Sequence, residues 1–211
     1  MNEVIDSTTV QRFIQQVAST SPMPASGSAA AVAGALAIGL AEKAINISLA
    51  SGSLKKDERE VFERTARQWH AVRIELLERA QEDVTSYREY LKIKRLQTDD
   101  AISARDELDH AIAATIAVPR RILQILADAL PYMSGLADRC KPILASEIHA
   151  AATLAYAASE VLCAVLEQNY SAHPHHAESH EAGRWLETTR ANVEESHRDV
   201  IGELRWSNAD K

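Results

Sequence analysis

Three charged side chains stand where they could act on a small polar substrate. Asp83 lies on the apolar side of a long predicted helix, next to Val84 and Tyr87. A carboxylate in such a place can act as a general base or stabilise a cation, although structural ion pairs are the commoner reason for a buried acid. Lys55 and Glu147 lie at predicted helix starts, where a lysine can donate a proton or anchor an anion. Both also have structural explanations, as a solvated helix start and as a carboxylate favoured by the helix dipole.

A tight turn leads into the first of two alanine-rich helices. Pro22 and Pro24 stiffen the approach, and Gly27 can adopt backbone conformations closed to other residues. We expect Ser28 to cap the helix that follows. Free N–H groups and the dipole at such a helix start would suit an anionic or carbonyl-bearing ligand. The alternative is a structural turn into a buried core helix.

Four histidines within eight residues raise the question of a metal site. Two of them are four residues apart and would share a helix face. The nearby acidic residues are Glu178 and Glu181, and no cysteine is close in sequence. We therefore expect an exposed polar linker and no bound metal. The four are His173, His175, His176 and His180.

The apolar spacing predicts helices throughout and no strand. Two of the helices are so rich in alanine that other backbones can approach them closely, and a helix that is apolar all round must be buried. The prediction is an all-α, single-domain bundle of six or seven helices over residues 1–211, with these two at its centre. Pro119 is expected to kink or restart one helix. The expected helices cover residues 8–19, 28–49, 55–94, 102–130, 146–169 and 183–206, with a loop at 171–183.

Composition and charge exclude several functional classes. The chain of 211 residues has a net charge of −7 and no basic face with interleaved aromatic residues, which argues against nucleic-acid binding. Glu42 and Lys43 interrupt the first alanine-rich helix, so we do not expect a membrane span. Cys140 and Cys163 have no metal-like spacing, and the acidic amino terminus is no signal peptide. A cytoplasmic protein is expected.

The chain resembles the cyclodeaminase/cyclohydrolase family, which includes formimidoyltetrahydrofolate cyclodeaminase and the methenyltetrahydrofolate cyclohydrolases. The matching residues recur along the chain in the same order as in the family. The family opens with Pro-x-Pro-Gly-Gly-Gly-Ser before an alanine-rich helix, and here Ala25 and Ser26 replace two glycines. Glu147 stands where the family has an aspartate, and Cys140-Lys141 replace Gly-Asn. The matching residues are Pro22, Pro24, Gly27, Ser28, Asn46-Ile47-Ser48, Lys55-Lys56, Asp83, Tyr87, Val118-Pro119, Ser146 and Asn169.

The resemblance implies an all-helical homodimer that binds folate near the glycine turn and the subunit interface. It implies a tetrahydrofolate derivative as the small-molecule substrate, with no metal and no other cofactor. The residues expected to be catalytic are Asp83, Glu147 and Lys55. The residues expected to contact substrate are Pro24, Ser26, Gly27, Ser28, Lys56, Tyr87, Lys141 and Ser146.

Three functions are consistent with these residues. The first is hydrolysis of the methenyl bridge of 5,10-methenyltetrahydrofolate, or the related cyclodeamination of a formimino group. The residues that depart from the family pattern motivate a second hypothesis, a family member that acts on another iminium, amidine or small polar substrate. The third is a non-catalytic helical dimer that binds a ligand or partner, because a fold alone does not determine function.

Overall fold

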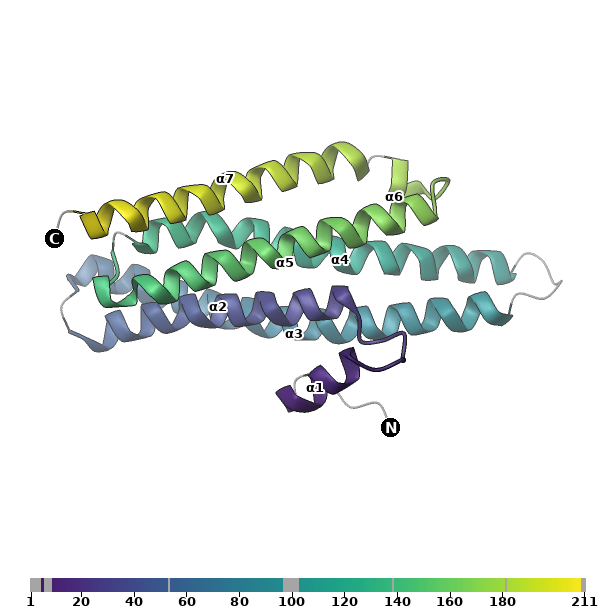
Figure 1. Ribbon diagram of the computed structural model, residues 1–211, viewed down its shortest axis with the longest axis horizontal. Coiled ribbons are helices and arrows are strands. Elements are labelled where there is room, and N and C mark those ends of the chain that lie inside the picture. The colour runs from purple at the N-terminus through teal and green to yellow at the C-terminus, as the bar shows by residue number, and fades with distance from the viewer. Residues whose placement is uncertain are drawn as a thin grey trace.

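Four long helices run antiparallel to one another and form the body of the chain (Figure 1). A fifth, α7, lies along their outer side, and the predicted all-helical fold is confirmed for the part of the chain that is described. The computed structural model describes residues 5, 9–52, 54–96, 103–137, 139–180 and 182–209. Its elements are α1 (Val10–Val17), α2 (Ser26–Ala50), α3 (Lys56–Leu96), α4 (Ser103–Ala137), the 3-10 turn η2 (Pro142–Leu144), α5 (Ala145–Ala172), α6 (Ala177–His180) and α7 (Ala182–Ala209).

The helices pack in an order that leaves α2 at one corner of the bundle. α2 packs against α3 and α5, whereas α4 packs against α3, α5 and α7. α2 and α4 therefore lie diagonally opposite, with few contacts between them. Whether residues 1–211 also fold as one independent unit stays a prediction.

The inner face of α2 is buried, as its alanine content predicts. Ala31, Ala37, Ala41 and Ile38 have no exposed surface. Small side chains let the neighbouring helices approach closely, and a Cβ added at Gly34 would lie only 2.9 Å from the Leu126 side chain of α4. Alanine also has the highest intrinsic helix propensity, so the same residues favour the helix and its close packing.

The outer face of α2 is not covered within the chain, although the sequence predicts burial all round. Leu36, at the middle of this face, is 61% exposed. It adjoins an uncovered face of α5, and Figure 1 shows both helices at the front of the bundle. We call this surface the α2–α5 apolar face; it comprises Ala29, Val32, Ala33, Leu36, Leu40, Ile47, Ala150, Leu154, Ala157, Val161 and Ala164, all exposed or half-buried.

Two segments are long and apolar enough to cross a membrane by length and composition, α2 and Pro142–Ala172. The bundle buries 56% of the most apolar stretch of the first and 44% of that of the second. Core helices of soluble proteins have the same composition, so these segments are weak grounds for a membrane protein.

Three local expectations differ from the structure. α4 continues through Pro119 and does not restart there, because the buried side chains around it, such as Ile116 and Ile122, hold the helix on its neighbours despite the missing N–H donor. The predicted loop at 171–183 contains the short helix α6. The first predicted helix is present as α1, but its apolar side is turned to solvent, since Val10 is 75% and Ile14 is 59% exposed.

Replacing Ala41 with leucine tests the tight packing of the inner face of α2. Ala41 has no exposed surface, so a larger side chain must displace its neighbours. We expect Ala41→Leu to lower the free energy of unfolding by about 1–3 kcal/mol in urea denaturation at fixed protein concentration. Ala50→Leu, at the exposed end of the same helix, should stay within about 0.5 kcal/mol of the parent. Equal stability of the two variants would contradict this packing.

Candidate active site at the start of α2

The start of α2 is held by a serine that serves as a cap from inside the helix. Ala25 occupies the N-cap position and has no side-chain oxygen to offer. Ser28, expected to be the N-cap itself, is instead the third helical residue, and its hydroxyl accepts a hydrogen bond from the Ala25 N–H at 3.0 Å. The helix therefore begins two residues earlier than predicted, at Ser26, whose side chain is exposed.

Asp83 lies directly against this helix start. A Cβ at residue 27 would lie 2.6 Å from the Asp83 Oδ1, which is closer than real Cβ contacts allow, so Gly27 is required for the approach. The Ser28 N–H and hydroxyl lie near the Asp83 carboxyl and lower its pKa, while the hydroxyl donates its hydrogen bond to the Ala25 carbonyl oxygen at 3.0 Å. The structure thus brings Asp83, Gly27 and Ser28 together, as the sequence predicts.

The surroundings of Asp83 raise its pKa toward neutral pH. Burial raises the pKa of Asp83 from 3.8 to about 6, because a charged carboxylate is poorly solvated between α2 and α3. The nearby Ser28 N–H and hydroxyl favour the charged form and act on the pKa in the opposite direction. A carboxyl with a pKa near 6 exchanges a proton readily at physiological pH, as a general acid–base catalyst must.

Other predicted substrate contacts lie near Asp83. Pro24 is buried in the turn before α2, after a cis Met23–Pro24 peptide bond. Tyr87 lies one helical turn beyond Asp83 on α3 and is half-buried, with its ring centroid 5.8 Å from that of Tyr90. We call the group formed by Pro24, Ser26, Gly27, Ser28, Asp83 and Tyr87 the Asp83 cluster.

The remaining predicted site residues lie at the other end of α2. Glu147 accepts a hydrogen bond from Lys43 at 3.0 Å and another from the Ser146 hydroxyl at 2.8 Å, and these bonds lower the pKa of Glu147. Lys43 follows Gly27 by 16 positions, so it lies about 24 Å farther along the helix. We call Lys43, Ser146 and Glu147 the Glu147 cluster.

The lysines expected at the site are also remote from Asp83 within one chain. Lys55 and Lys56 are exposed at the turn between α2 and α3, and Lys141 is exposed just before η2. The 27 positions from Lys56 to Asp83 correspond to about 40 Å of helix. These lysines therefore lie apart from Asp83 within a single chain, because the α2–α3 hairpin places its turn at the far end of the bundle.

Lys43 is the residue of these two clusters that the sequence analysis did not select. Lys43 is exposed, yet it forms an ion pair with Glu147 that joins α2 to α5. The charged pair Glu42-Lys43 within an alanine-rich helix is the sequence signal for it.

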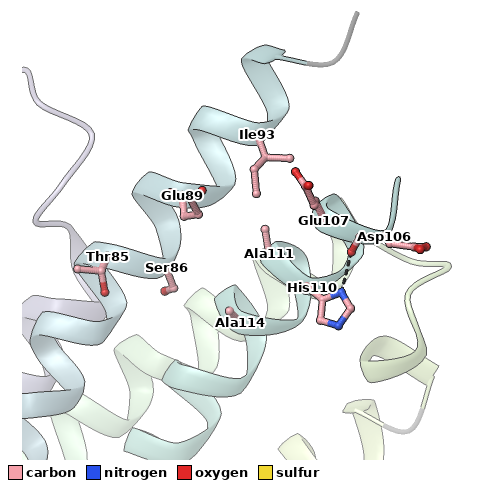
Figure 2. A pocket seen from close by; sticks show the side chains of 9 residues that line it. All are labelled: Thr85, Ser86, Glu89, Ile93, Asp106, Glu107, His110, Ala111 and Ala114. Atoms are coloured by element: carbon pink, nitrogen blue, oxygen red, sulfur yellow. Dashed lines mark hydrogen bonds between the residues drawn. The ribbon is translucent and has the colours of Figure 1, made fainter. Parts of the chain in front are cut away.

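A cavity of about 1080 Å³ lies elsewhere, between α3 and α4 (Figure 2). Its α3 lining, which includes Ser86, Glu89 and Ile93, comes from a different side of the helix than Asp83 and Tyr87. In Figure 2 the ring of His110 turns away from the opening, with its Nδ1 2.7 Å from the Asp106 carbonyl oxygen. This cavity therefore contains neither of the two clusters.

The described part of the histidine-rich segment does not form a metal site. His173 ends α5, and the His176 Nε2 lies 3.2 Å from the carbonyl oxygen of Asp109. His175 is exposed, and the side chain of His180 lies outside the described residues. Among the side chains that are described, no three of His, Cys, Asp or Glu converge as metal ligands.

Comparison with known proteins identifies the family. The family model for formiminotransferase-cyclodeaminase matches residues 9–182, more than four fifths of the chain. The chain belongs to this family. Its members are enzymes of folate metabolism, so a folate derivative is the expected class of substrate.

A solved structure shares the fold. The formiminotetrahydrofolate cyclodeaminase of Thermotoga maritima superposes with a TM-score of 0.84 over 95% of this chain and 98% of that chain, at 23% sequence identity. A search of curated proteins found no match. Both the Asp83 and Glu147 clusters lie inside the segment matched to the formiminotransferase-cyclodeaminase family, whereas most of α7 lies outside it.

The pKa of Asp83 makes stability depend on pH in a defined direction. Asp83 ionises near pH 4 in the unfolded chain and near pH 6 in the folded one, so the unfolded state loses the proton first. The free energy of unfolding should therefore fall as pH rises from about 4 to about 6, by about 1–3 kcal/mol from this residue. Urea denaturation across this pH range should show that the free energy of unfolding changes less with pH in Asp83→Asn than in the parent.

Glu82→Gln is the matched control for this measurement. Glu82 is the preceding residue and pairs with Arg79 instead of the start of α2. Its variant should keep the pH slope of the parent. If Asp83→Asn and Glu82→Gln give the same slope, the raised pKa belongs to another group.

Proposed function

We propose that this protein makes or breaks a C–N bond at the one-carbon bridge of a tetrahydrofolate derivative, with Asp83 as its acid–base residue. The observation that carries the proposal is the Asp83 carboxyl, with a pKa of about 6, held against the start of α2 in a chain of the formiminotransferase-cyclodeaminase family. A small-molecule substrate and a cytoplasmic location are part of this proposal.

Two reactions use the same proton transfers. In cyclodeamination, a ring-closing nitrogen attacks the carbon of the protonated formimino group and gives its proton to the Asp83 carboxylate. The C–N bond to the departing amine then breaks as Asp83 returns that proton, and ammonia leaves. In methenyl hydrolysis, water is the nucleophile and Asp83 takes one of its protons. Asp83 then protonates the nitrogen that is released, while the hydroxyl of the intermediate loses its remaining proton to solvent as the C=O bond forms.

The start of α2 supports a carboxylate that changes its charge during the cycle. The Ser28 N–H and hydroxyl favour the charged form, and burial favours the neutral form. A carboxylate beside a cationic methenyl carbon also stabilises the charge that develops there. Tyr87, one turn away, offers an aromatic surface to the flat ring system of the substrate.

A homodimer is the second part of the proposal, and the α2–α5 apolar face supports it. A two-fold axis through the middle of that face, near Leu36, would pack α2 against α2 in antiparallel fashion. Residue 35 lies midway between Gly27 and Lys43, so this symmetry would bring the Glu147 cluster of the partner subunit beside Asp83. The 24 Å separation within one chain would then become a contact between two chains.

The activity test measures both reactions and compares two adjacent acidic residues. Absorbance reports methenyltetrahydrofolate as it forms from formiminotetrahydrofolate or disappears by hydrolysis. Asp83→Asn should lower kcat by about 10²–10⁴, because general acid–base catalysis contributes this much, and Glu82→Gln should match the parent. An Asp83→Asn variant as active as the parent would remove Asp83 from the mechanism.

The same assay separates the alternatives. A parent protein that accelerates neither reaction would contradict the folate function. Activity on another iminium or amidine would then identify a member with a changed substrate, consistent with Ala25, Ser26 and Glu147. A folded protein that binds but turns over nothing would be the non-catalytic dimer.

Mixing two inactive variants tests whether the site is built from two subunits. Asp83→Asn and Glu147→Gln should each be inactive alone if Glu147 completes the site of the partner. After exchange of subunits, a mixed dimer regains one intact site, so activity should return to about a quarter of the parent value. Leu36→Glu should sediment as a monomer. The double variant Leu36→Glu/Asp83→Asn should therefore stay inactive when it is mixed with Glu147→Gln. A mixture that stays inactive while subunits demonstrably exchange would contradict the shared site.

A further inference from the structure

A small cationic and aromatic cluster lies beyond Asp83, where α3 continues past the start of α2 (Figure 1). The Lys94 ammonium donates a hydrogen bond to the Tyr90 hydroxyl at 3.1 Å and lies 5.4 Å from the centroid of the ring. His173 meets the same ring edge-on, with centroids 5.5 Å apart. We call Tyr90, Lys94 and His173 the Lys94 cluster.

The cluster is held in place from two helices. Tyr90 is 7% exposed and packs in the core, so its hydroxyl is a fixed acceptor for Lys94. The N–H of His173 donates to the carbonyl oxygens of Asn169 and Tyr170 at the end of α5, at 3.1 and 3.2 Å. The ring of His173 is therefore positioned by the end of α5, while the ammonium of Lys94 remains exposed to solvent.

Lys94 places a positive charge here, in a chain whose net charge is −7. The pKa of Lys94 is raised, first by its hydrogen bond to Tyr90, so Lys94 is charged at neutral pH. The pKa of His173 is lowered, first by burial and then by repulsion from Lys94 and His176. Among the described residues that act on these two pKa values, none is a carboxylate. An anion placed between Lys94 and His173 would relieve this repulsion.

The spacing along α3 connects this cluster to Asp83. Residues 83, 87, 90 and 94 recur at intervals of four, three and four, so they share one side of the helix. Eleven positions of helix separate Asp83 from Lys94 by about 16 Å. The side chains in between are Tyr87 and Tyr90, which contact each other. The order along α3 is therefore an acid, two aromatic rings and a cation.

We propose that the Lys94 cluster is a carboxylate-binding subsite for the anionic end of an elongated substrate whose reacting end lies at Asp83. Lys94 and protonated His173 would each donate a charge-assisted hydrogen bond to the carboxylate, which is stronger than a bond between neutral groups. This inference rests on the proposed function for the identity of the reacting end. The substrate class is a heteroaromatic compound with a carboxylate-bearing tail, such as the glutamate of a folate.

The binding test uses the intact protein and needs no turnover. The ring protons of His173 are followed by NMR through a pH titration, with and without saturating glutarate as a soluble dicarboxylate. Glutarate should raise the pKa of His173 in the parent and in Lys94→Arg, and should leave it unchanged in Lys94→Met. Lys92→Met is the matched control, because Lys92 pairs with Glu89 and belongs to no cluster, and it should respond like the parent. No glutarate-dependent shift in the parent would overturn the proposal.

A kinetic arm separates a substrate tail from a free anion. For a folate substrate that carries its glutamate, Lys94→Met should raise KM about tenfold or more, the effect of losing one charge-assisted hydrogen bond. The advantage in KM of this substrate over the same compound without its glutamate should disappear in Lys94→Met and return in Lys94→Arg. If glutarate shifts His173 but the two substrates keep their KM ratio in Lys94→Met, a free anion binds there and the tail assignment is wrong. If glutarate binds while neither folate is turned over, the anion subsite stands and the proposed function fails.

Discussion

The close approach of one carboxylate to one helix end determines the geometry of the candidate site. Gly27 has no side chain, and this lets the Asp83 carboxyl reach the first turn of α2, where the Ser28 N–H and hydroxyl meet it. Burial and hydrogen bonding act in opposite directions on the pKa of Asp83, and burial prevails. A methyl group at residue 27 would move the acid away from its donors, so the unusual pKa and the glycine depend on each other.

Small side chains also allow close approach of the helices farther along α2, which is rich in alanine. Small side chains at Ala37 and Ala41 allow α5 and α3 to lie near the α2 backbone, and this fixes where residue 83 falls relative to residue 27. Larger residues would widen the spacing between helix axes, which follows the size of the side chains at the contact. The position of Asp83 therefore depends on the close packing of the inner face of α2.

Much of this could be predicted from the sequence, since helical periodicity and a glycine turn are local signals. The helices and the proximity of Gly27 to Asp83 follow from them and from the family resemblance. The remoteness of Lys55 also followed from the predicted helix lengths, because a hairpin of two long helices places its turn far from their other ends. The pairing of Lys43 with Glu147 could not be predicted, because it depends on the register between α2 and α5, two helices far apart in sequence. Neither could the inside cap of Ser28, which arises because Ala25 offers no oxygen.

The outer face of α2 has a composition that is unusual for a helix side left uncovered by its own chain. A helix side that faces water in a soluble protein is normally rich in charged residues, yet this one carries Ala33, Leu36 and Leu40. Large exposed apolar patches on soluble proteins mark sites of association. The face runs from the Asp83 cluster to the Glu147 cluster, the two groups that the family resemblance assigns to one site. The composition of the face and the separation of the clusters are therefore explained together if this surface is where a second copy of the chain packs.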